Sequence, residues 1–104
     1  MATTREIAAG EAALKAYVEA ADGWEAAFVP ESAYLTGATD VIQAADGAAD
    51  QSSSGRQAAG KAALRAAIDS TGYGGWVTDQ NCSDGATAIL QAVAAIRVPP
   101  KQGD

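Results

Sequence analysis

The sequence predicts an all-α domain, a four-helix bundle-like fold built from two tandem helix–loop–helix repeats with pseudo-two-fold symmetry. Three observations predict it. The chain of 104 residues is rich in alanine, which loses no side-chain entropy in a helix. Its larger apolar residues recur at helical spacing. Two stretches, each about fifty residues long, also carry the same pattern in the same order, as duplicated units do.

Three matching segments carry the repeat. Gly10 matches Gly60 and Leu14 matches Leu64, both at an offset of 50 residues. These matches are informative because alanine matches arise easily by chance in an alanine-rich chain. The aligned segments are 8–19 with 58–69, 23–24 with 75–76, and 37–44 with 85–92.

The domain organisation follows from this alignment. Residues 1–104 are expected to form one domain, because the length suits a single small core. Repeat one covers about residues 3–50 and repeat two about residues 54–98. Residues 99–104 begin with two prolines and are expected to fray unless a partner holds them. Each helix pair has one apolar stripe, so the two repeats should pack together.

The first helix is expected over about residues 5–21. Thr3 and Glu6 have the spacing of a capping box, in which each side chain accepts a hydrogen bond from the other residue's backbone N–H. Leu14 and Val18 lie on one apolar face at helical spacing. This helix therefore packs through a narrow stripe.

The third helix is the counterpart of the first and is expected over about residues 55–70. Ser54 and Gln57 form its predicted capping box. Leu64 and Ile68 form its apolar stripe.

The second and fourth helices are expected to open at matched positions, with Thr36 and Asp84 as N-caps. The second helix should end near Ala49, and Pro30-Glu31 could begin an earlier turn before Thr36. The fourth helix should stop before Pro99. The residues expected to face the core are Val41, Ile42, Ala45, Ile89, Val93 and Ile96.

Gly10 and Gly60 interrupt the first and third helices at equivalent positions. Each costs about 1 kcal/mol of helix propensity relative to alanine. Their repeated presence predicts close-packed helix crossings that leave no room for a Cβ atom.

The net charge argues against two classes of partner. Thirteen acidic residues outnumber seven basic ones, giving a formal net charge of −6. Nucleic acids and anionic membranes both attract clustered lysine and arginine, so we expect neither as a partner. No apolar stretch suggests a signal peptide or a membrane span. We expect a protein that is cytoplasmic, or assembled into a particle within a cell, and not secreted by a signal peptide.

The chemistry-bearing residues are sparse. The chain has no histidine and one cysteine, Cys82, so Cys/His and Ser/His catalysis and common transition-metal sites are excluded. An inert thiol is the favoured interpretation, although a helix N-terminus near Asp84 could activate it. Paired carboxylates are the remaining acid–base option. The candidate carboxylates are Asp22, Glu25, Glu31, Asp40, Asp46 and Asp50.

Two motifs resemble ligand-binding loops without matching them. Residues 55–62 have most of a phosphate-binding loop, but no strand is predicted before them and Ala62 replaces the hydroxyl residue. Residues 79–84 alternate oxygen-bearing side chains as calcium loops do, but the required glycine and glutamate are replaced by Asp84 and Leu90. We expect no cofactor and no metal.

Five aromatic residues lie in or near the two long loops: Trp24, Phe28, Tyr34, Tyr73 and Trp76. They form either loop anchors over the core or an interaction surface, since Trp and Tyr are enriched at interface hot spots.

The sequence favours a non-catalytic structural or assembly protein, such as a small subunit of a virion or another large complex. Its expected partners are other protein subunits, or copies of itself in a homo-oligomer. The alternatives are a regulatory or peptide-binding helical module and, less favoured, a small carboxylate-based enzyme.

Overall fold

The computed structural model describes residues 3–20, 32–70 and 77–97. Their helices are α1 (Thr4–Ala20), α2 (Ser32–Asp46), α3 (Ser53–Asp69) and α4 (Asp79–Arg97). No strand occurs in these described ranges. The prediction of an all-α, four-helix bundle-like domain is therefore confirmed.

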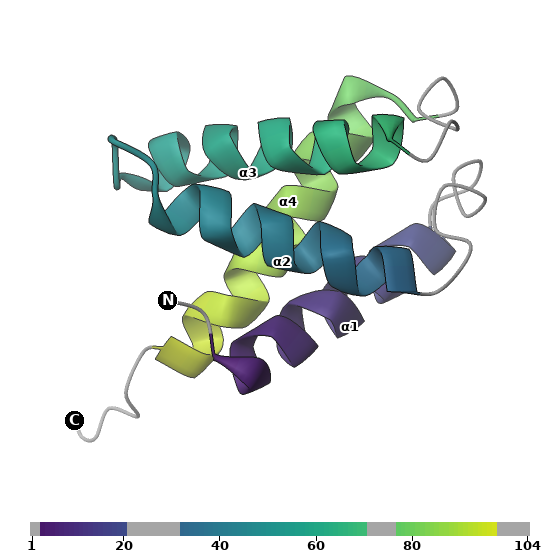
Figure 1. The fold of residues 1–104 in the computed structure, drawn as a ribbon, viewed down its shortest axis with the longest axis horizontal. Coiled ribbons are helices and arrows are strands. Elements are labelled where there is room, and N and C mark those ends of the chain that lie inside the picture. The colour runs from purple at the N-terminus through teal and green to yellow at the C-terminus, as the bar shows by residue number, and fades with distance from the viewer. Residues whose placement is uncertain (1–2, 21–31, 71–76, 98–104) are drawn as a thin grey trace.

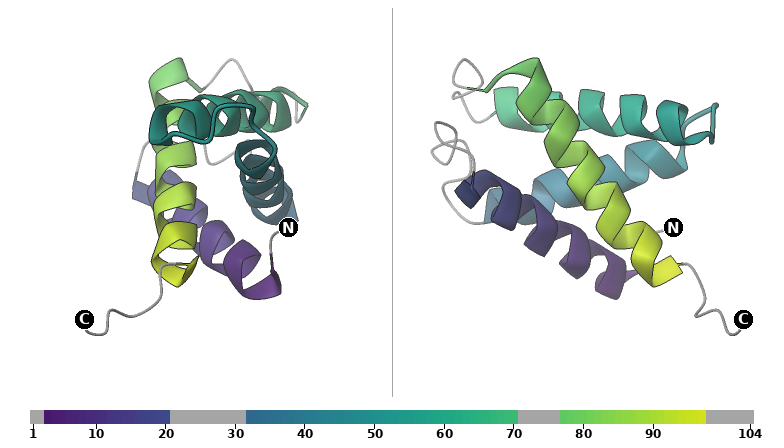
Figure 2. Two further views of the ribbon diagram at one scale, coloured as in Figure 1. Left: turned by 90° about the vertical axis from the view of Figure 1, so that its left-hand side faces the viewer. Right: turned by 180° about the vertical axis from the view of Figure 1, so that it is seen from behind.

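The four helices pack in a ring. Helix α1 packs against α2 and α4, and α3 packs against the same two helices, while α2 and α4 make a smaller contact across the middle. Figure 1 shows α2 and α3 side by side, with α4 crossing behind them and α1 below α2. The view from behind in Figure 2 shows α4 running diagonally across the other helices. Each half of the chain therefore depends on the other half for its core.

The core lies where the predicted apolar stripes meet. Leu14 and Val18 of α1 and Leu64 and Ile68 of α3 are fully buried. Ile7 is partly buried at the edge of this cluster. The fully buried side chains that α2 and α4 contribute are Ala38, Val41, Ile42, Ala45, Cys82, Ala86 and Ile89. The apolar pattern thus predicted the inward faces of the helices, except at Ile96, which is only partly buried and lies outside the core cluster.

The Thr3–Glu6 capping box is confirmed. The backbone N–H of Thr3 donates to Oε1 of Glu6 at 3.0 Å, and the backbone N–H of Glu6 donates to Oγ1 of Thr3 at 3.1 Å. These bonds satisfy two backbone donors that a helix start leaves unpaired.

The predicted cap of α3 is wrong by two residues. Ser52, not Ser54, is the N-cap, and its Oγ accepts a hydrogen bond from the backbone N–H of Gly55 at 3.2 Å. Gln57 reaches across to α4 instead of capping its own helix. Three consecutive serines offer similar caps, and Asp50 selects Ser52 by accepting its backbone N–H at 2.9 Å.

The predicted caps at Thr36 and Asp84 are also wrong, because both residues lie inside longer helices. Thr78 caps α4: its Oγ1 accepts from the backbone N–H of Asn81 at 3.0 Å, and Oδ1 of Asn81 accepts from the backbone N–H of Thr78 at 3.1 Å. The helix therefore starts at Asp79, which places a carboxylate in its first turn.

Gly10 and Gly60 are buried in equivalent surroundings. A Cβ added at Gly10 would lie 3.1 Å from Cγ2 of Ile89 on α4. One added at Gly60 would lie 3.0 Å from Cγ1 of Val41 on α2. The further neighbours are Ile42 and Ala38 for Gly10, and Leu90 and Ala86 for Gly60.

The neighbours of Gly10 and the neighbours of Gly60 occupy equivalent positions when the first half of the sequence is aligned with the second half. At the offset of 48 residues seen in the second and fourth helices, Ala38 corresponds to Ala86, and Val41 to Ile89. Each glycine thus meets equivalent residues of its own half and of the opposite half. The order of buried and exposed positions over residues 9–20 is also the same as over residues 59–70. Gly10 and Gly60 therefore lie against equivalent positions of the aligned segments.

Candidate functional site

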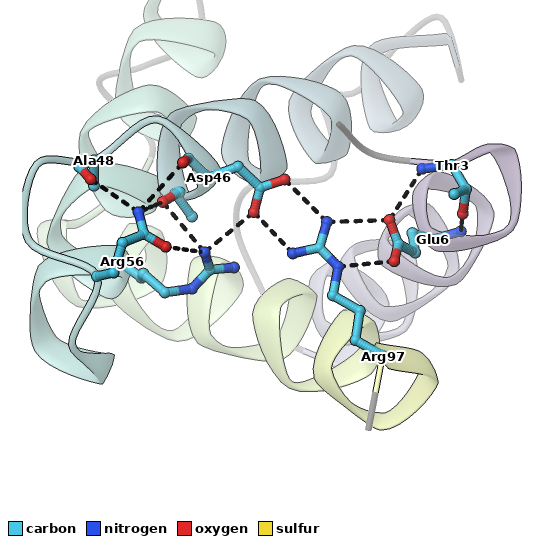
Figure 3. A network of polar contacts seen from close by, with 8 residues as sticks. Thr3, Glu6, Asp46, Ala48, Arg56 and Arg97 are labelled. Atoms are coloured by element: carbon cyan, nitrogen blue, oxygen red, sulfur yellow. Dashed lines mark hydrogen bonds and ion pairs between the residues drawn. The ribbon is translucent and has the colours of Figure 1, made fainter. Parts of the chain in front are cut away.

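A polar network joins all four helices at one end of the molecule (Figure 3). Arg97, the last described residue of α4, donates to both oxygens of two carboxylates. Its Nε and Nη2 bind Glu6 of α1 at 2.7 and 3.1 Å. Its Nη1 and Nη2 bind Asp46 of α2 at 2.8 and 2.9 Å. Such two-point contacts fix the guanidinium plane as well as the charge.

Arg56 of α3 completes the network. Its Nη1 donates to Oδ1 of Asp46 at 3.1 Å, to the carbonyl oxygen of Ala45 at 3.3 Å and to Oε1 of Gln51 at 2.9 Å. The side-chain amide of Gln51 donates to the carbonyl oxygens of Ala45 and Ala48, each at 2.8 Å. The network therefore also holds the turn between α2 and α3.

The network determines the charge state of its carboxylates. Hydrogen bonds from Arg97 lower the pKa of Glu6 from 4.5 to about 2, and the backbone N–H of Thr3 contributes. Hydrogen bonds from Arg97, and then from Arg56, lower the pKa of Asp46 from 3.8 to about 2. The same carboxylates raise the pKa of Arg97. Both carboxylates stay ionised near neutral pH, which suits ion pairing and not proton transfer.

A groove with a volume of about 620 Å³ lies between α3 and α4. Leu90, Val93 and Ala94 give it an apolar side. Its remaining lining is polar: Gln51, Ser53, Arg56, Gln57, Thr87, Gln91 and Arg97. An apolar floor with hydrogen-bonding rims is typical of sites that bind an organic ligand or a peptide.

A second groove, of about 370 Å³, lies between α1 and α2. Leu35 is 44% exposed here and is the exposed large apolar side chain of the described residues. Ile7 lines the same groove and also packs against the core. The other lining residues are Thr4, Ala8, Glu11 and Thr39.

Cys82 is fully buried in α4. Burial raises the pKa of its thiol, although Arg65 opposes the shift from 3.7 Å away. Arg65 also donates to the carbonyl oxygen of Val77 at 2.6 Å and pairs with Asp69 at 3.1 Å. This environment lowers the fraction of reactive thiolate and makes Cys82 a core residue.

Of the five aromatic residues, Tyr34 is 6% exposed and belongs to the hydrophobic core, which fits the anchoring alternative at this position. Trp24, Phe28, Tyr73 and Trp76 lie outside the described residues.

The candidate carboxylates among the described residues lie in different surroundings. Asp46 belongs to the arginine network, and Asp50 caps the turn before α3, where hydrogen bonds from Ser52 lower its pKa. Asp40 lies on α2 at an intermediate exposure. The other three candidates, Asp22, Glu25 and Glu31, lie outside the described residues.

The two loop-like motifs lie in helices. Residues 55–62 are part of α3, so their backbone N–H groups do not form a phosphate cradle. Residues 79–84 are the first turns of α4, where Asn81 completes the capping box with Thr78 and Gln80 donates to Oδ1 of Asp84 at 2.8 Å. Within the described ranges, no three His, Cys, Asp or Glu side chains come close enough to hold a metal ion.

Sequence reasoning missed the arginine network. It predicted Glu6 only as a cap and did not single out Arg97. These residues are 91 positions apart, so only the packing of α1 beside α4 brings them together. The sole local signal was a basic residue in the last turn of a helix, which is common.

Comparison with known proteins identifies no relatives: no family model, curated protein or solved structure matches the chain. None of the described helices has the length and apolar character needed to cross a bilayer.

Proposed function

We propose that the protein is a non-catalytic structural or assembly protein, a small subunit of a virion or another large complex. The carrying observation is the groove between α1 and α2, which keeps Leu35 44% exposed beside Ile7. The large apolar side chains of the core are covered on the same scaffold. An apolar groove left open on a well-packed frame suits contact with another protein.

The arginine network supports the same proposal. Arg97 holds Glu6 and Asp46 as ionised partners and ties the ends of the helices together. Arg56 extends the connection to α3. This network of charge-assisted hydrogen bonds therefore holds the ends of the four helices in fixed positions, as an assembly subunit requires.

We attribute the fold to an internal duplication. The ordered sequence matches support it, and so do the exchanged surroundings of Gly10 and Gly60. A duplicated scaffold gives one chain two similar surfaces, and only one of them has to be adapted to a partner.

A regulatory or peptide-binding module is the second candidate. The groove of about 620 Å³ between α3 and α4 favours it, because Leu90 and Val93 offer an apolar floor beside the hydrogen-bonding side chains of Gln57 and Gln91. In this case the partner is a short segment and not a permanent neighbour.

The test is the native state of the protein in the cells that make it. Affinity isolation followed by sedimentation should recover a stoichiometric complex far heavier than the 10.4 kDa chain. Capsid or tail genes beside its gene would support the virion form. A lone monomer with no stoichiometric partner would contradict the proposal.

A further inference from the structure

We propose that the groove between α1 and α2 is a docking site for a positively charged, amphipathic helix of a partner protein. This inference rests on the proposed function and adds the place of contact and the chemistry of the partner. Three properties of the groove carry it: its apolar lining, its counterpart in the second half, and its charge.

The lining presents apolar groups on two neighbouring helices. Leu35 projects from α2 with 44% of its surface exposed, and Ile7 and Ala8 line the groove from α1. Such a groove accepts the apolar face of a helix, which offers side chains at positions i, i+3, i+4 and i+7. Ile7 is anchored against the core, so the groove is part of the rigid frame.

The equivalent place in the second half is polar. Gln57 occupies the position of Ile7, and Ser83 the position of Leu35. The side-chain amide of Gln57 donates to Oγ of Ser83 at 2.8 Å and to its carbonyl oxygen at 3.1 Å. A weaker contact of 3.5 Å reaches Oγ1 of Thr87.

This difference shows which side chains the packing of the helices requires and which ones it does not require. The α3–α4 pair packs with a hydrogen-bonded polar group where the α1–α2 pair has two apolar side chains. Packing of the shared frame therefore does not require Ile7 and Leu35 to be apolar. Ile7 and Leu35 together are therefore available for contact with a partner.

Charge identifies the partner. Glu11 is the charged residue of the lining, and the position equivalent to it in the second half is Lys61. The whole chain carries a net charge of −6. A helix with lysine or arginine beside its apolar stripe is attracted over a distance and pairs with Glu11 at the rim. A second copy of this chain would bring its own negative charge, so copies are disfavoured as occupants.

The test uses the purified full-length protein and two synthetic peptides. Both are 18-residue helices with the same leucine stripe, and the remaining positions are lysine in one and glutamate in the other. Titration calorimetry measures affinity, and ¹⁵N–¹H spectra locate the bound peptide. The lysine peptide should bind at least tenfold more tightly than the glutamate peptide, and shift changes should centre on α1 and α2.

The decisive variant is the Ile7→Gln, Leu35→Ser double substitution. It gives α1 and α2 the side-chain types that α3 and α4 carry, so the fold should survive. It should weaken the lysine peptide at least tenfold, because two apolar contacts are lost. Glu11→Gln should weaken binding about twofold to threefold at low salt, and its matched control, Lys61→Gln, should not weaken it.

Three results would overturn the inference: unchanged affinity in the double variant, shift changes centred on α3 and α4, or equal affinity for both peptides. If the protein dimerises as its concentration rises and the double variant does not, the occupant of the groove is a second copy of this chain and not a partner helix. The proposed function is tested separately, by the native complex. A native complex without peptide binding at α1–α2 rejects only this inference, and peptide binding without a native complex rejects only the assembly role.

Discussion

The two halves of this protein bury equivalent residues, but their surface contacts and grooves differ. In the first half, Arg97 reaches from α4 to bind Glu6 and Asp46. The equivalent positions in the second half are Arg56 and Ala94, and both line the large α3–α4 groove. The contacts of Arg97 with Glu6 and Asp46 thus form a clamp at the end of the first half, whereas the equivalent place in the second half is part of a groove.

Helix length explains this difference. At the offset of 48 residues, Arg97 corresponds to Ala49, but α2 ends at Asp46. Helix α4 therefore continues far enough to place Arg97 beside Glu6 and Asp46, whereas α2 ends before the equivalent position. The two halves therefore share their buried positions and differ in where α2 and α4 end and in the residues that line the grooves.

The largest expected effect tests the packing that the two halves share around Gly10 and Gly60. Gly10→Val and Gly60→Val should each destabilise the protein by about 3 kcal/mol, because the added atoms meet packed side chains. Urea unfolding measures the loss. The control variants Ala12→Val and Ala62→Val lie on exposed helix faces and should cost about 0.5 kcal/mol each. A large loss of unfolding free energy in only one of the two glycine variants would show that the two halves are not packed equivalently.

The next effect tests the clamp. Arg97→Met removes the donor shared by Glu6 and Asp46 and should cost about 2 kcal/mol in urea unfolding. Arg56→Met should cost less, because Arg56 contacts only one of these carboxylates. Equal costs for the two variants would mean that the clamp does not distinguish the halves.

The clamp also predicts a pH dependence. The pKa of Glu6 is lowered from 4.5 to about 2 in the folded protein, and that of Asp46 from 3.8 to about 2. Lowered folded-state values give stability that is present above the unfolded values and lost as the pH falls toward 2. Unfolding free energies should therefore fall between about pH 4.5 and pH 2. Arg97→Met should flatten this fall, and an unchanged slope would contradict the pKa assignment.

The smallest expected effect concerns the groove residues Ile7 and Leu35, which differ between the two halves. The Ile7→Gln, Leu35→Ser variant should change the unfolding free energy by less than about 1 kcal/mol, because the second half accepts these side-chain types. Thermal unfolding of this variant and of the unmodified protein measures it. A loss comparable to that of the glycine variants would show that Ile7 and Leu35 serve the core.

The sequence was a good guide where structure depends on local pattern. The spacing of Leu14 and Val18 identified an inward face, and Thr3 with Glu6 identified a helix start, because both depend on residues within one or two turns. Its errors at Thr36 and Asp84 arose because good capping residues also occur inside helices.

The candidate site was less predictable. The groove at Leu35 and the clamp at Arg97 depend on which helices become neighbours, and this is set by packing across the whole chain. The alignment of the halves pairs Ile7 with Gln57, but only packing shows that these positions line a surface.

One measurement tests the central claim that a shared scaffold carries one adapted groove. A photoreactive benzoylphenylalanine is placed either at Leu35 or at the equivalent Ser83, in the cells that make the protein. After irradiation, cross-linked partner is quantified by mass spectrometry. The account predicts one predominant protein partner cross-linked from Leu35 and several-fold less from Ser83. Equal cross-linking from both sites, or cross-linking from Ser83 alone, would contradict it.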